Sequence, residues 1–160
     1  MDTQLAFSGF PRAGLEFLSD LATHNDRTWF EAHKKIYQEM LLEPAQAFVM
    51  ALGFRLQEIS KGIHYDTRTD GRGVLMRIHR DIRFSQDKTP YNTHLRGLFW
   101  EGERKKNESP AFGFQIDATG MSLMTAPLSL VAENGCKMIA FISPIFIHTR
   151  WPARMKMIAE

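Results

Sequence analysis

The hydrophobic period of this chain changes once along its length, and that change strongly limits the folds open to it. From Pro11 to Ser60 the apolar residues recur every three or four positions, which predicts helices. From Val74 to Asp117 they alternate with polar residues in short segments separated by polar turns, which predicts strands. Helices gathered ahead of strands with short turns favour an α+β fold, with an N-terminal helical layer packed on a mainly antiparallel β-sheet.

Three helical segments are predicted in the first third. The first begins at Pro11, and the second follows Asn25 or Asp26, either of which suits an N-cap. A third segment restarts at Pro44, so Glu43 marks either a boundary or a kink. The expected apolar face of the second helix consists of Trp29, Ile36, Tyr37, Met40 and Leu41.

The strand region is expected to begin with a half-buried strand over 74–84. Its period of two places Val74, Met76, Ile78, Ile82 and Phe84 on the apolar side, and Arg77, His79, Asp81 and Arg83 on the other. Further strands are predicted over 95–100 and around 112–116. The loop 117–120 between apolar segments is typical of a hairpin.

Composition is that of an ordinary globular domain, and we expect a single domain over 1–160. The chain has 160 residues, 44% of them hydrophobic and 24% charged, with a formal net charge of +2. This charge is too small to favour nucleic acid or an acidic membrane as a partner. The chain starts without a basic, apolar leader, and its single cysteine has no partner. We therefore expect a cytoplasmic protein; its oligomeric state is not determined by the sequence.

Motifs of the common reaction classes are absent from the sequence. It contains no glycine-rich phosphate loop, no nucleophile elbow, no HExxH and no paired cysteines. The six histidines show no metal-ligand spacing. The sequence therefore predicts no cofactor and no metal site, and it leaves open whether the protein is an enzyme.

One segment, 77–91, is unusually rich in charge and is the candidate site. Arginine offers a forked guanidinium that suits phosphate or carboxylate, so the segment predicts the binding of a small anionic ligand. The candidate ligand-binding residues are Arg77, Arg80, Arg83, Asp87 and Lys88, with Trp29 near enough to line a pocket. In an enzymatic version, Asp81 or His79 would act as general base.

Arg80 carries the most specific expectation. The strand period places it beside Ile78 and Ile82, on the apolar side, where an unpaired guanidinium is costly. We therefore expect Arg80 to be mostly buried and paired with a carboxylate, Asp87 being the nearest candidate in sequence.

Two other functions remain open. In the first, the charges form a structural ion-pair network in a non-enzymatic domain that binds another macromolecule. In the second, basic residues and the aromatic residues Phe84, Tyr91, Phe99 and Trp100 bind single-stranded nucleic acid. Arginines converging on an open cleft would favour a small anionic ligand, whereas arginines each capped by a carboxylate would favour the structural network.

Two blocks of the sequence resemble a known family. They are NDRTWFEAHKKIY over 25–37 and RIHRDIRFSQDKTPY over 77–91. Both are similar to bacterial and fungal proteins grouped as domain of unknown function 2461, and the likeness extends over about 7–121. The resemblance implies a cytoplasmic α+β domain and supplies no activity. Residues 125–160 depart from the family pattern, and we expect either a truncated or altered tail or a closing strand followed by a short helix.

Overall fold

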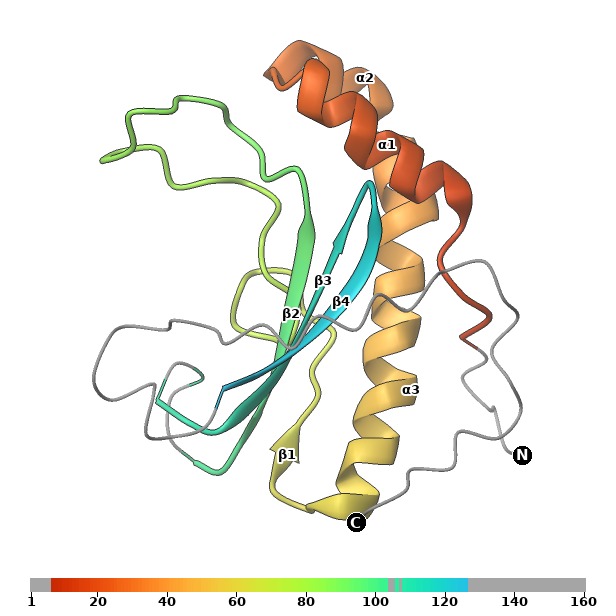
Figure 1. Cartoon of the computed structure of the whole chain (residues 1–160), viewed down its shortest axis with the longest axis vertical. Helices are drawn as coiled ribbons and strands as arrows, with labels where there is room; N and C mark the ends of the chain where they lie inside the picture. Colours follow the sequence, from red (N-terminus) through yellow and green to blue (C-terminus); the bar gives the residue numbers. More distant parts are fainter. Residues whose placement is uncertain (1–6, 104–105, 107, 127–160) are drawn as a thin grey trace.

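A computed structural model describes residues 7–103, 106 and 108–126, and it confirms the α+β fold class (Figure 1). Three α-helices come first: α1 (Arg12–Thr23), α2 (Arg27–Tyr37) and α3 (Glu43–Ile59), with a π-helical turn η1 (Gln38–Leu42) between α2 and α3. Four strands follow: β1 (Ile63–His64), β2 (Leu95–Glu101), β3 (Ala111–Asp117) and β4 (Gly120–Ala126). They form one antiparallel sheet in the order β1-β2-β3-β4.

The helical layer follows local signals in the sequence. Asp26 is the N-cap of α2, and its carboxylate accepts a hydrogen bond from the Trp29 amide at 2.9 Å. Where a boundary or a kink was expected at Glu43, the chain passes through η1 directly into α3. The reason is Pro44, which has no N–H to donate to the Met40 carbonyl. The Met40 carbonyl lies against Gly14 of α1, so the backbones of α1 and η1 approach each other closely.

The core lies between α3 and the sheet. Phe48 of α3 packs edge-on against Phe114 of β3, with ring centroids 5.0 Å apart, and both side chains are buried. In Figure 1, α3 runs beside the sheet while α1 and α2 cross near one end of it. One expectation for the helical layer is wrong, because Ile36 of α2 is exposed rather than part of the buried face.

The predicted strands over 95–100 and 112–116 are confirmed as β2 and β3, which pair with Gly97 opposite Phe114. The predicted hairpin is also confirmed, since β3 and β4 close on the pair Asp117 and Gly120. Gly120 has a φ of 142°, a backbone conformation that side-chain-bearing residues rarely adopt.

The strand predicted over 74–84 is wrong: this segment is irregular. It makes two separate bridges, one between Leu75 and Gly97 and one between His79 and Tyr91. The backbone thus pairs first with β2 and then with its own continuation, so no single ladder extends along it. The alternation of side chains breaks accordingly, and Phe84, predicted to face the core, is 95% exposed.

Among residues 7–103, 106 and 108–126, no helix is long and apolar enough to cross a membrane. The two readings of the tail over 125–160 fall almost wholly outside the described residues, which end at 126. The expected cytoplasmic location and the extent of the single domain stay predictions.

Candidate functional site

The candidate site is the segment 77–91, called here the charged loop, which leaves the end of the sheet and returns to it (Figure 1). Its two ends are hydrogen-bonded to each other. The Arg80 amide donates to the Pro90 carbonyl, and the Asn92 amide donates to the Ile78 carbonyl, each at 2.8 Å. The loop therefore has a narrow, paired base of backbone from which 81–89 extends.

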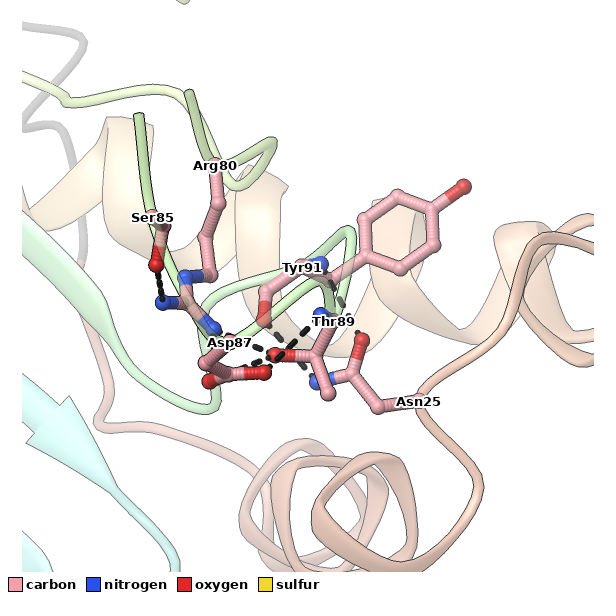
Figure 2. A network of polar contacts seen from close by, with 6 residues as sticks. All are labelled: Asn25, Arg80, Ser85, Asp87, Thr89 and Tyr91. Atoms are coloured by element: carbon pink, nitrogen blue, oxygen red, sulfur yellow. Dashed lines mark hydrogen bonds and ion pairs between the residues drawn. The ribbon is translucent and has the colours of Figure 1, made fainter. Parts of the chain in front are cut away.

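Asn25, in the turn between α1 and α2, holds this base to the helical layer. Its side-chain amide donates to the Tyr91 carbonyl at 2.9 Å, and its side-chain oxygen accepts from the Tyr91 amide at 3.0 Å. Figure 2 shows Asn25 meeting the backbone of Tyr91 while the Tyr91 ring points away from the polar network. That ring stacks on Phe30 of α2 at a centroid distance of 4.1 Å. The loop is thus fixed to α2 by polar and aromatic contacts.

Within the loop, Arg80 is the centre of a polar network (Figure 2). Its guanidinium donates to the Asp87 carboxylate and the Thr89 hydroxyl, and more weakly to the Ser85 hydroxyl at 3.5 Å. Asp87 also accepts from the Thr89 amide at 2.9 Å. The predicted pairing of Arg80 with Asp87 is confirmed, and the Arg80 side chain is mostly buried, with 26% of it exposed. Its burial comes from the folded loop and not from the face of a strand.

A second ion pair lies on the outer side of the loop. Arg83 makes a forked contact with Asp81, with nitrogen–oxygen distances of 2.9 and 2.6 Å, and both side chains are exposed. The Lys88 ammonium donates a hydrogen bond to the Ile82 carbonyl at 3.0 Å. The hydrogen bonds from Arg83 lower the pKa of the Asp81 carboxyl to about 2, and the charge of the exposed Arg77 adds to this effect. Two of the three predicted anion-binding arginines are therefore already capped by carboxylates.

Phe84 does not face the core, although the predicted strand over 74–84 required this. Its ring lies in solvent, with the Arg83 guanidinium 5.8 Å from the ring centroid. An aromatic side chain in water is not unusual by itself. Here, however, it is carried by a loop in which the side chains of Arg80, Arg83 and Lys88 each donate a hydrogen bond to another residue of the loop.

The other predicted site residues are separated from this network. His79 packs by its ring against Tyr91 at 5.0 Å, and no hydrogen bond joins it to Asp81 within the described residues. Trp29 stacks on His33 at 4.1 Å and contacts Phe17, as part of the helical layer. The general-base role of His79 or Asp81 therefore stays a prediction that no contact supports.

The aromatic residues proposed to stack on nucleic acid divide into two groups. Tyr91 and Phe99 are buried in the core, so their faces are closed to a base. Phe84 is exposed and Trp100 is partly so. Among the described residues, no group of three or more histidine, cysteine or acidic side chains comes together as metal ligands would.

Acid should weaken the loop between about pH 4 and pH 2. The Thr89 amide and the Arg80 guanidinium, both donating to Asp87, lower the pKa of its carboxyl from 3.8 to about 2. Because this folded-state pKa lies below the unfolded one, Asp87 contributes stability above about pH 4, and the contribution is lost as the pH falls through about 2. In urea unfolding at several pH values, the midpoint urea concentration of Asp87→Asn should fall less than that of the parent over this interval. Equal losses for the two proteins would contradict the expectation.

The comparisons with known proteins give a family and no activity. A model of the family described as "Conserved hypothetical protein (DUF2461)" matches residues 13–134, and this range includes Asn25, α2 and the whole charged loop. No curated protein and no solved structure matches the chain. The match extends over more than half of the sequence, so the chain belongs to the conserved hypothetical protein family DUF2461.

Proposed function

We propose that this domain binds another protein through the charged loop, with Phe84 as the side chain that enters the partner. The observation that carries the proposal is the 95% exposure of Phe84 on a loop fixed at its base and cross-linked inside. Aromatic residues and arginines dominate the binding energy of protein interfaces, and here Phe84 and Arg83 lie side by side.

The polar network supports the proposal through preorganisation. Arg80 joins Ser85, Asp87 and Thr89, so the two arms of the loop are tied together on either side of Phe84. A loop that already has its bound shape loses less conformational entropy on association. In this proposal the charged residues hold the binding loop in shape, as in the structural ion-pair network that the sequence left open.

The charge of the loop indicates the chemistry of the partner. Within 77–91, four cationic side chains and two carboxylates leave a local charge of +2. A partner with an apolar pocket for Phe84 and an acidic rim would match this surface. Small-anion binding by Arg77, Arg80 and Arg83 is the weaker proposal, since Arg80 and Arg83 would first have to release Asp87 and Asp81.

The test places a photo-crosslinking benzoyl group at position 84, and at position 54 as a control. Phe54 of α3 is also an exposed phenylalanine, with 61% of its surface free, but it lies outside the charged loop. A protein captured at position 84 is purified, and its binding to the parent and to Phe84→Ser and Phe54→Ser is measured by calorimetry. We expect Phe84→Ser to weaken binding by about 30-fold, as for an aromatic hot spot of about 2 kcal/mol.

Both serine variants replace exposed side chains, so the free energy of unfolding of each should lie within about 0.5 kcal/mol of that of the parent. Phe54→Ser should bind as the parent does. The proposal fails if position 84 yields no more crosslinks than position 54, or if Phe84→Ser binds the captured protein with unchanged affinity. It also fails if the loop binds anionic vesicles or single-stranded oligonucleotides instead of a protein.

A further inference from the structure

A hollow beside β1 is lined by no residue of the charged loop and has no part in the proposed protein contact. Its volume is about 320 Å³, at the lower end of the range of small-molecule sites. It is lined by residues of α3, β1 and β2 and by the chain that follows β1, among them Gln57, Tyr65, Asp66 and Trp100. The size fits one or two fused rings rather than a polymer.

The walls of the hollow are held in place by backbone and side-chain bonds. The Val74 amide donates to the Asp66 carbonyl at 2.8 Å, and Gln57 donates to the Ile63 carbonyl at 2.8 Å. The Tyr65 side chain packs directly on Gly53 of α3, where a Cβ would come closer than 3.0 Å to it. The cavity is therefore formed before a ligand arrives.

One wall is aromatic and flat. His64 of β1 and Trp100 of β2 are register partners, and their rings stack at 5.0 Å with an angle of 14° between the planes. His64 Nε2 lies 2.9 Å from the Gly102 carbonyl, which can only accept, so Nε2 carries the proton. In the neutral ring, Nδ1 is then an acceptor. Each ring thus has one face covered by the other, and Lys106 Nζ lies 5.7 Å from the Trp100 ring centroid. The outer face of the exposed His64 ring is therefore the surface on which a planar ring can stack.

The polar edge of the hollow combines an acceptor and a donor. Asp66 accepts from the Arg68 amide at 2.8 Å and from Arg68 Nε at 2.5 Å, and a carboxylate has room for two further bonds. The terminal nitrogens of Arg68 have no hydrogen-bond partner within the described residues. A carboxylate and a guanidinium thus stand side by side with capacity to spare.

We propose that this hollow binds a free purine nucleoside, with guanine as the preferred base. Guanine presents amide and amino donors on one edge and the acceptors O6 and N7 on another. Asp66 would accept from the donors, Arg68 would donate to the acceptors, and the ring would stack on the outer face of His64, next to Trp100. Adenine lacks this order of donors and acceptors and would bind more weakly.

The experiment uses the full chain labelled with ¹⁵N and follows the indole N–H of Trp100, identified with Trp100→Phe. Guanosine should shift this signal in a saturable way, with an affinity at least tenfold higher than that of adenosine. Asp66→Asn should lose at least tenfold in affinity for guanosine. Asp70→Asn is the matched control, since Asp70 lies near Arg72 with the same spacing but is not part of the hollow.

Several results would overturn the proposal. They are the absence of a saturable shift up to about 10 mM guanosine, which would detect even millimolar binding, and equal affinities for the two nucleosides. Unchanged guanosine binding by a folded Asp66→Asn would do the same. If Asp66→Asn fails to fold, His64→Ala replaces it and should also lose at least tenfold in affinity for guanosine, because it removes the exposed ring on which the base would stack. Phe84→Ser should bind guanosine as the parent does, which separates this test from that of the proposed protein contact.

Discussion

Replacing Gly97 with alanine should lower the free energy of unfolding by about 3 kcal/mol. Gly97 lies in the middle of β2, opposite Phe114 of β3. A Cβ at this position would come closer than 3.0 Å to two ring carbons of Phe114. Alanine normally stabilises a strand relative to glycine by about 0.5–1 kcal/mol, whereas overpacking a core costs about 1–3 kcal/mol and occasionally more. The steric term should win here.

The Phe114 ring cannot easily move away from an added methyl group. It is fully buried and packs against Phe48 at 5.0 Å and Phe99 at 6.1 Å. Gly113 on the neighbouring strand is the matched control, since a Cβ there meets nothing nearer than the Leu98 side chain at 3.4 Å. Gly113→Ala should change stability by less than about 1 kcal/mol.

Thermal unfolding checks this expectation directly. Gly97→Ala should lower the midpoint by about 10 °C. The double variant that combines Gly97→Ala with Phe114→Leu should lose less stability than the sum of the losses of the two single variants, because the smaller side chain leaves room for the added methyl group. Strict additivity of the two changes, or a Gly97→Ala protein as stable as Gly113→Ala, would refute the close packing of ring on glycine.

Asn25→Ala should cost about 2–3 kcal/mol and loosen the charged loop. Asn25 is the hydrogen-bond partner of both backbone groups of Tyr91, a residue that is only 3% exposed. Alanine would leave a buried amide and a buried carbonyl without a partner, each at about 1–1.5 kcal/mol. Asn25→Asp would keep the acceptor but would set a carboxylate oxygen against the Tyr91 carbonyl, so it should not restore the stability of the parent.

Asn92 provides the control for this change. Its side chain makes one long bond of 3.4 Å to the Arg77 carbonyl, so Asn92→Ala should cost less than about 0.5 kcal/mol. Urea unfolding gives the stability, and amide hydrogen exchange gives the local effect, with faster exchange expected over 79–91 in Asn25→Ala alone. Unchanged exchange in the loop would mean that Asn25 does not hold it.

These two predictions concern the same chain of contacts from the core to the loop. Phe114 and Gly97 position β2, β2 pairs with the chain at Leu75, and the loop base then closes at Tyr91. Asn25 and Phe30 join that base to α2. The exposed position of Phe84 therefore depends on packing far from the loop tip.

The sequence by itself determined those features that depend on neighbours along the chain. The N-cap of the second helix at Asn25 or Asp26, the hairpin at Gly120 and the pairing of Arg80 with Asp87 each involve residues within a few positions of one another, and the structure selects Asp26 as the cap. Their geometry follows from local backbone rules and from the cost of leaving a charge unpaired. The order of helices before strands was readable for the same reason, because period is a local property.

The tertiary structure alone decided the path of 74–84 and with it the candidate site. Alternation of side chains cannot tell which backbone groups find partners, and here Leu75 pairs with β2 while His79 pairs with Tyr91. The bond from Asn25 to Tyr91 spans 66 positions, and the stack of His64 on Trp100 joins two strands. Phe84 is exposed because the loop folds around Arg80 instead of continuing along the sheet. The base of that loop is held by Asn25 and Phe30, which are distant in sequence.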